Sequence, residues 1–177
     1  QTYRDNDFWE AWRQELWSPA LFKAALCRSA SMVPVALGMT RAYPTIEQLQ
    51  TIVPNPVAYH YQYRDGLRCT IFLMTGLVRD FTFAASVEGQ AKPLSTLMFL
   101  ADAGHVTTIP SQFSPLVHHA EQLFLTGEAQ YPIERTLLTS GLLIAGIDSG
   151  LEHRRVETPH LAAVNYQPHA ESTFWRV

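Results

Sequence analysis

The sequence lacks the short motifs that bind phosphates, hold metals or present a nucleophile. It contains no G-x-G-x-x-G and no G-x-x-x-x-G-K-[ST], and its glycines are scattered singly, so no phosphate-binding loop is predicted. It also contains no H-E-x-x-H, no C-x-x-C and no G-x-S-x-G nucleophile elbow. From the residues alone, we predict no catalytic residue, no cofactor-binding residue and no metal ligand in this chain.

Histidines are present, but their spacing does not predict a metal site. The seven histidines include one adjacent pair, His118-His119. Neighbouring residues on a regular helix point about 100° apart, so both side chains cannot face the same metal ion. No further ligand has the spacing of a zinc site. We therefore interpret the pair as solvated or capping side chains.

Cysteine is scarce, and positive charge is not concentrated anywhere. Cys27 and Cys69 lie far apart, in a helix-like run and in a predicted strand. Two buried, reduced thiols are typical of a cytoplasmic protein, which is the localisation we predict; a disulfide stays open as the alternative. The formal net charge is −3, and Arg154-Arg155 is the only adjacent basic pair, so we predict no nucleic-acid partner.

Long hydrophobic runs, repeats and low-complexity tracts are also missing. No apolar run approaches 18 residues, so neither a membrane span nor a signal peptide is predicted. The 177 residues are 47% hydrophobic, which predicts a single globular domain spanning residues 1–177. Charged residues make up only 16%, which favours a surface partly covered by a partner.

The strongest positive signal lies in residues 57–100, which have the pattern of an antiparallel β-meander. Asp65-Gly66 separates two runs rich in Val, Ile, Phe, Tyr and Thr, a pattern typical of a type I′ hairpin. Thr75-Gly76 and Glu88-Gly89-Gln90 offer two further reversals. The predicted strands span residues 57–63, 67–74, 77–87 and 93–100.

Alternation of side chains assigns two faces to the second predicted strand. The apolar face carries Leu67, Cys69, Ile71 and Leu73. The opposite face is mixed: it carries polar residues and two large apolar side chains. A face exposed to solvent should carry polar side chains only. Two interpretations stay open: helices cover both faces, or the mixed face contacts another domain or subunit. On the second interpretation, the interface candidates are Arg68, Thr70, Phe72 and Met74.

Helices are predicted before and after the meander. A stripe of large apolar residues that begins at Phe8, followed by the cap-and-start pair Ser18-Pro19, predicts helical structure over residues 7–29. Short helical turns are predicted near residues 45–50. Two further helices are predicted over 115–126 and 132–149, and the second is apolar around most of its circumference. The predicted fold class is α+β, an antiparallel sheet of at least four strands with helices packed on it.

Four segments, in their order and spacing, resemble a known family. They comprise residues 63–68 with the apolar strand that follows, 80–85, 131–141 and 155–161. Together with the run at 17–26, they resemble the C-terminal domain of the Gfo/Idh/MocA oxidoreductases. The resemblance is to a branch of that family whose members are described only by the general term oxidoreductase. The resemblance covers nearly the whole chain, and its most specific pieces are P-I-E-R-T-L-L-T-S-G and R-R-V-E-T-P-H-L.

The resemblance implies the second of that family's two domains and only that one. In the family, an N-terminal Rossmann domain binds NAD(P), and the α+β domain contacts substrate and assembles the oligomer through its sheet. The family's Glu-Lys-Pro cofactor motif and its G-G…D…H catalytic segment are absent here. Because the chain begins with Gln, we expect a fragment that lacks its Rossmann domain. We expect this fragment to bind no cofactor by itself.

The expected function follows from the resemblance. We expect the substrate-side and oligomerisation domain of an NAD(P)-dependent oxidoreductase acting on a sugar or small molecule, inactive without the dinucleotide-binding domain. NAD or NADP is the expected cofactor of the full-length protein. The expected partner is a second copy, in a homodimer or higher homo-oligomer formed through the sheet. The alternative hypothesis is a non-catalytic dimerisation or binding module.

Overall fold

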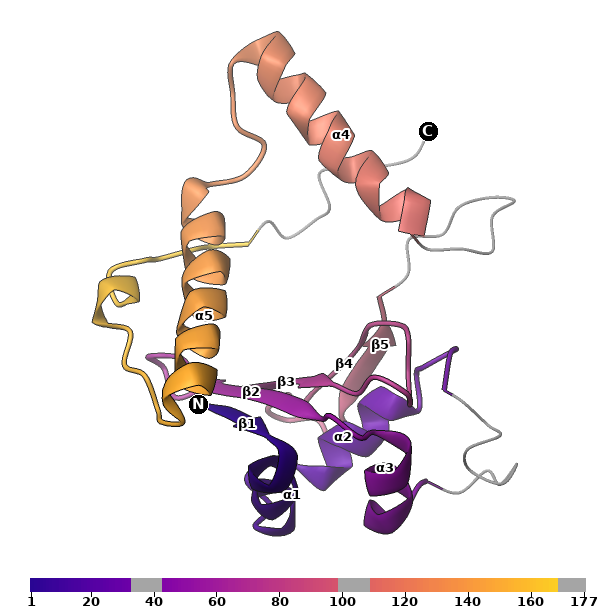
Figure 1. Ribbon diagram of the computed structural model, residues 1–177. Helices are drawn as coiled ribbons and strands as arrows, with labels where there is room; N and C mark the ends of the chain where they lie inside the picture. The colour runs from indigo at the N-terminus through magenta and orange to yellow at the C-terminus, as the bar shows by residue number, and fades with distance from the viewer. Residues whose placement is uncertain (33–42, 99–108, 169–177) are drawn as a thin grey trace. The chain divides into compact units, whose positions relative to one another are not determined.

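The computed structural model describes residues 1–32, 43–98 and 109–168, which fall into two compact units (Figure 1). Unit 1 contains the described residues of 1–98 and 146–155, and unit 2 those of 99–145 and 156–177. The fold is α+β with antiparallel sheets, as predicted.

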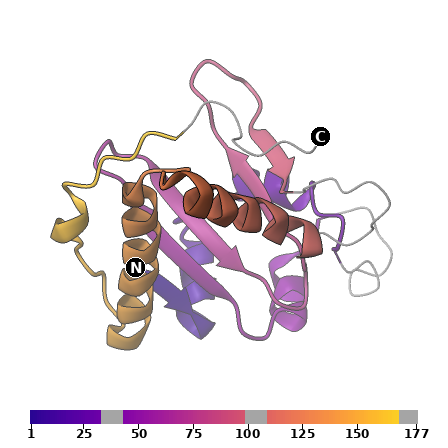
Figure 2. The ribbon, with the colours of Figure 1, turned by 90° about the horizontal axis from the view of Figure 1, so that it is seen from above.

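The larger sheet of unit 1 has three antiparallel strands in the order β1-β2-β3. They are β1 (Thr2–Arg4), β2 (Val57–Gln62) and β3 (Arg68–Leu73). Strands β2 and β3 lie side by side as the predicted hairpin (Figure 2). The predicted type I′ turn is wrong, because that turn needs a positive φ at both central residues, and of Asp65 and Gly66 only Gly66 has one, at +90°. No sequence signal marks β1, because three residues are too few to show a period.

The expectation of one sheet with four or more strands is wrong for the described part of the chain. Strands β4 (Thr82–Ala85) and β5 (Leu94–Leu97) form a separate two-stranded sheet. The chain between the two sheets turns at the exposed Thr75 and Gly76, and the flanking Met74 and Leu77 are buried, at 5% and 0% exposed. Residue 77 therefore packs into the core and does not continue a ladder with β3.

The helices follow their local signals closely in the first half of the chain and less closely in the second. Ser18 caps α2 by accepting a hydrogen bond from the Leu21 N–H, as predicted. Predicted helix 115–126 in fact begins at residue 109 and includes Pro115, while predicted helix 132–149 continues through Gly150 to residue 152. The observed helices are α1 (Asp5–Arg13), α2 (Pro19–Leu26), α3 (Ile46–Ile52), α4 (Ile109–Thr126), α5 (Ile133–Glu152) and the 3₁₀-helix η2 (Pro159–Leu161).

The core of unit 1 lies between the three-stranded sheet and α1, α2 and α3, which share one side of it (Figure 1). We call this side the inner face. On it, the Phe72 ring makes T-shaped contacts with Trp17 and Phe22, with centroid distances of 5.2 and 5.4 Å. Phe8 also contacts the Phe72 ring, at 6.2 Å. Aromatic side chains of α1 and α2 therefore fill the space above β3.

The last turns of α5 pack on the opposite, outer face of the sheet, over β1 and β2. The buried Ser149 hydroxyl accepts a hydrogen bond from the Thr2 N–H at 2.8 Å and donates one to the Arg154 carbonyl at 2.7 Å. A Cβ at Gly146 would lie 2.9 Å from the Tyr59 ring. Only glycine therefore allows α5 to approach β2 this closely.

Unit 2 contains α4, the first part of α5 and the segment around η2. Leu161 of η2 packs on α5 at Gly141, where a Cβ would lie 2.5 Å from a Leu161 methyl carbon. The Arg135 guanidinium lies over the Tyr131 ring, 4.5 Å from its centroid. Among the described residues, none of the helices is both long enough and apolar enough to cross a membrane.

Candidate functional site

The predicted interface candidates lie on the inner face, which helices cover. Met74 is buried in the core and Phe72 lies among the aromatic rings of α1 and α2. Thr70 is half-buried, and its Oγ1 lies 2.9 Å from His60 Nδ1. Arg68 alone is exposed. The assignment of Phe72 and Met74 to a contact with another subunit is therefore corrected: their partners are the chain's own helices.

The outer face of β3 is the apolar face that the structure leaves exposed. Strand alternation places Leu67, Ile71 and Leu73 on this face, opposite Phe72. The end of α5 covers the neighbouring part of the face, at β1 and β2, through its contacts with Thr2 and Tyr59. The exposed apolar row therefore begins where the contact with α5 ends.

The β4–β5 hairpin has the same division of faces. Helix α2 contacts this hairpin, and Arg28 just after the helix donates a hydrogen bond from Nε to Ser95 Oγ at 2.9 Å. The side that carries Phe83 is turned away from Ser95, because Phe83 pairs with the next residue, Thr96. We define the outer apolar surface as the seven side chains that point away from α2 on the two sheets and are 45% to 67% exposed: Leu67, Ile71, Leu73, Phe81, Phe83, Leu94 and Met98.

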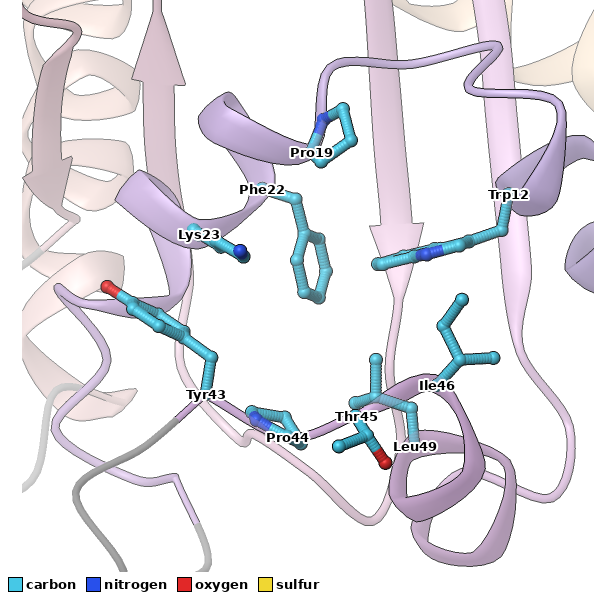
Figure 3. Close-up of a pocket in the computed structure, with 9 residues that line it drawn as sticks. All are labelled: Trp12, Pro19, Phe22, Lys23, Tyr43, Pro44, Thr45, Ile46 and Leu49. Atoms are coloured by element: carbon cyan, nitrogen blue, oxygen red, sulfur yellow. The ribbon is translucent and has the colours of Figure 1, made fainter.

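A pocket lies on the other side of the core, between α1, α2 and α3 (Figure 3). Its volume is about 220 Å³. Figure 3 shows Phe22 and Lys23 on one side of it, Trp12 and Tyr43 at its two ends, and Pro44 opposite Phe22. The lining residues are Trp12, Pro19, Phe22, Lys23, Tyr43, Pro44, Thr45, Ile46 and Leu49.

Local structure explains how the pocket walls are held. Thr45 and Gln48 form a capping box at the start of α3, which fixes the entry of the chain into that helix. The Tyr43 hydroxyl contacts the Cys27 thiol just after α2. This hydrogen bond raises the pKa of Tyr43, so the phenol stays protonated at neutral pH. Residues from both sides of the 33–42 segment therefore line one cavity.

The two cysteines are free thiols, so they do not form a disulfide. Cys69 is half-buried, and burial raises its thiol pKa. Cys27 is exposed, contrary to the expected burial, because it follows the last turn of α2 at the surface. The raised pKa of Cys69 is the opposite of the lowered pKa that marks a nucleophilic thiol.

The other titratable side chains considered as site candidates are His60, Tyr61 and the histidine pair at 118–119. Burial lowers the pKa of His60 and raises that of Tyr61, which indicates neutral, structural side chains. The rings of His118 and His119 are 5.8 Å apart at 81° to each other. Within residues 1–32, 43–98 and 109–168, no group of three His, Cys, Asp or Glu side chains is placed to hold a metal ion.

The arrangement thus offers an apolar surface for protein contact and a small pocket for a ligand. The alternation of side chains in the sequence could have suggested the apolar surface. The pocket had no such signal, because its walls come from segments far apart in the chain.

In comparisons with known proteins, no family model, no curated protein and no solved structure matches this chain.

Proposed function

We propose that this chain is the substrate-side and oligomerisation domain of an oxidoreductase, and that it pairs with a second copy of itself through the outer apolar surface. The observation that carries the proposal is the exposure of seven large apolar side chains, each between 45% and 67%, on two hairpins that follow each other in the chain. Apolar groupings of this kind on soluble proteins mark protein contacts.

The energetics are sufficient for self-association. Covering the exposed half of a Leu, Ile, Phe or Met side chain contributes about 1 kcal/mol. Seven such side chains from each of two copies contribute roughly 14 kcal/mol in an isologous dimer. Association costs on the order of 4–15 kcal/mol, so the net free energy of association ranges from about −10 to about +1 kcal/mol. We take a cost of about 6 kcal/mol, in the lower part of this range, which gives a dissociation constant in the micromolar range. An apolar and aromatic composition is also typical of homodimer interfaces.

The oxidoreductase part of the proposal depends on the resemblance to the Gfo/Idh/MocA C-terminal domain, which is strongest at residues 131–141 and 155–161. On that basis we propose that family's fold for the chain and a sugar or another small molecule as substrate. NAD or NADP would be bound by a separate domain. The pocket between α1, α2 and α3 is not where we place the cofactor, because its volume of about 220 Å³ is below the roughly 300 Å³ at which ligand pockets begin.

The assembly part is tested by light scattering coupled to size exclusion at about 100 µM, well above the expected dissociation constant. We expect a mass of twice the 20.0 kDa chain for the wild type. Ile71→Lys introduces a charge into the outer apolar surface and should give a monomer. Gln50→Lys adds the same charge at an exposed position of α3 and should leave the dimer intact. A monomeric wild type would contradict the proposal.

The redox part is tested separately by titrating NADH and NADPH into this chain and into the longest natural form of the protein. We expect no micromolar binding by this chain and micromolar binding by a form that contains a G-x-G-x-x-G after a strand. Micromolar binding by this chain would contradict the division of roles. A dimeric protein whose natural form binds neither cofactor would favour the alternative, a non-catalytic dimerisation or binding module.

A further inference from the structure

The pocket between α1, α2 and α3 has room for one ring. An apolar cavity of about 150 Å³ takes up benzene, and pockets for drug-sized molecules begin at about 300 Å³. The volume of about 220 Å³ lies between these values. The space therefore suits a single six-membered ring with a small substituent.

The pocket walls favour a flat, apolar ligand body. Trp12 and Phe22 meet in a T-shaped contact, with centroids 4.7 Å apart and an interplanar angle of 82°. Two rings at nearly a right angle offer a face and an edge, and aromatic rings prefer these two modes of contact. Ile46 and Leu49 from α3 add an aliphatic wall. A planar aromatic ring makes better use of this shape than a sugar, whose hydroxyls would find few partners.

One charge faces this apolar space. Lys23 is the only charged side chain among the nine lining residues, and Figure 3 shows its ammonium directed toward the cavity. It lies 5.8 Å from the centroid of the Tyr43 ring and forms no ion pair with any residue that the structure describes. The phenol of Tyr43 stays protonated, so it adds no negative charge beside Lys23.

We propose that this pocket binds a small planar aromatic carboxylate, with its ring against Trp12 and Phe22 and its carboxylate on the Lys23 ammonium. A neutral ligand of the same shape would leave the ammonium without a counter-charge, and a cationic ligand would be repelled by it. This site is independent of the proposed assembly and redox roles, because the outer apolar surface lies across the sheet from it.

Benzoate is the probe for the test, and nitrogen-15 NMR is the readout. We expect benzoate to shift the Trp12 indole N–H and the backbone amides near Thr45. Benzamide has the same shape without the charge and should bind about fivefold more weakly, the factor that corresponds to an exposed ion pair.

Variants of Lys23 separate charge recognition from shape. Lys23→Met keeps the apolar stem and should weaken benzoate about fivefold, to the level of benzamide. Lys23→Glu should reverse the preference, so that benzamidine, a planar cation, binds better than benzoate. Lys92→Met removes the other, exposed lysine of the chain and should change neither affinity.

Three results would overturn the proposal. They are the absence of shifts at Trp12 up to millimolar benzoate, equal affinities for benzoate and benzamide, and equal losses in Lys23→Met and Lys92→Met. Lys23 is exposed on α2, so its variants are expected to fold, which an unchanged amide spectrum away from the pocket would verify.

Discussion

Replacing Gly76 with alanine should be among the most destabilising single-methyl changes in this chain. Gly76 has φ +104°, a conformation that L-residues avoid. A Cβ there would also lie 2.4 Å from the backbone oxygen of Ile52, well inside contact distance. The turn that Gly76 forms leads from β3 to the buried Leu77, so it has little freedom to move.

The magnitude follows from two separate costs. Holding an alanine in a left-handed conformation costs about 1–2 kcal/mol. Relieving a contact with a backbone atom requires a shift of α3 or of the turn, and strain of this kind in a packed region costs roughly 1–3 kcal/mol. The sum, about 2–5 kcal/mol, is a large part of the 5–15 kcal/mol by which a domain is ordinarily stable.

Gly89→Ala is the matched control. Gly89 also has a positive φ, +78°, but nothing lies within 4 Å of the position of its Cβ. It should therefore show only the conformational cost, about 1–2 kcal/mol. Urea unfolding followed by tryptophan fluorescence measures both variants, because Trp9, Trp12 and Trp17 lie in unit 1 together with both glycines. Equal losses in the two variants would refute the contribution of the Ile52 contact.

The remaining predictions concern Ser149 and His60. Ser149→Ala leaves the buried Thr2 N–H without its acceptor and should cost about 1–3 kcal/mol in urea unfolding, whereas Thr139→Ala, at an exposed site on the same helix, should cost under roughly 0.5 kcal/mol. Burial lowers the pKa of His60 in the folded state, so the unfolded state binds a proton at this residue more readily. The contribution of His60 to the free energy of unfolding is therefore fully present above the unfolded pKa of about 6.5 and falls as the pH drops below that value. His60→Gln should reduce that loss of stability between about pH 7 and 5.5, and an unchanged slope would contradict the assignment.

Signals confined to a few neighbouring residues predicted structure well. Ser18 caps α2 and the Asp65-Gly66 pair forms the β2–β3 turn, because capping and turn geometry depend on atoms within four residues of each other. The end of α5 was not predicted in the same way. Gly150 looks like a stop signal, yet it lies within α5, in the part of the helix that contacts β1. Tertiary contact there outweighs the low helix propensity of glycine.

Local sequence patterns also did not predict that the meander divides into two sheets. Residues 77–81 have the composition of a strand, but Leu77 gains more by packing beside Met74 in the core than by extending a ladder. That choice depends on α3, whose Ile52 carbonyl lies against Gly76. The resemblance to the oxidoreductase family remains a prediction, which the cofactor titrations above address.

By itself the sequence determined the α+β class, the positions of the main helices, the β2–β3 hairpin and the existence of two unlike faces on β3. Tertiary structure alone decided which of those faces is exposed. Alternation places Ile71 and Phe72 on opposite faces but does not predict what packs on either face. The aromatic side chains of α1 and α2 cover Phe72, so the face that carries Ile71 is the exposed one. The pocket likewise exists only in three dimensions, because Trp12, Lys23 and Leu49 come together only when three helices pack on one face of the sheet.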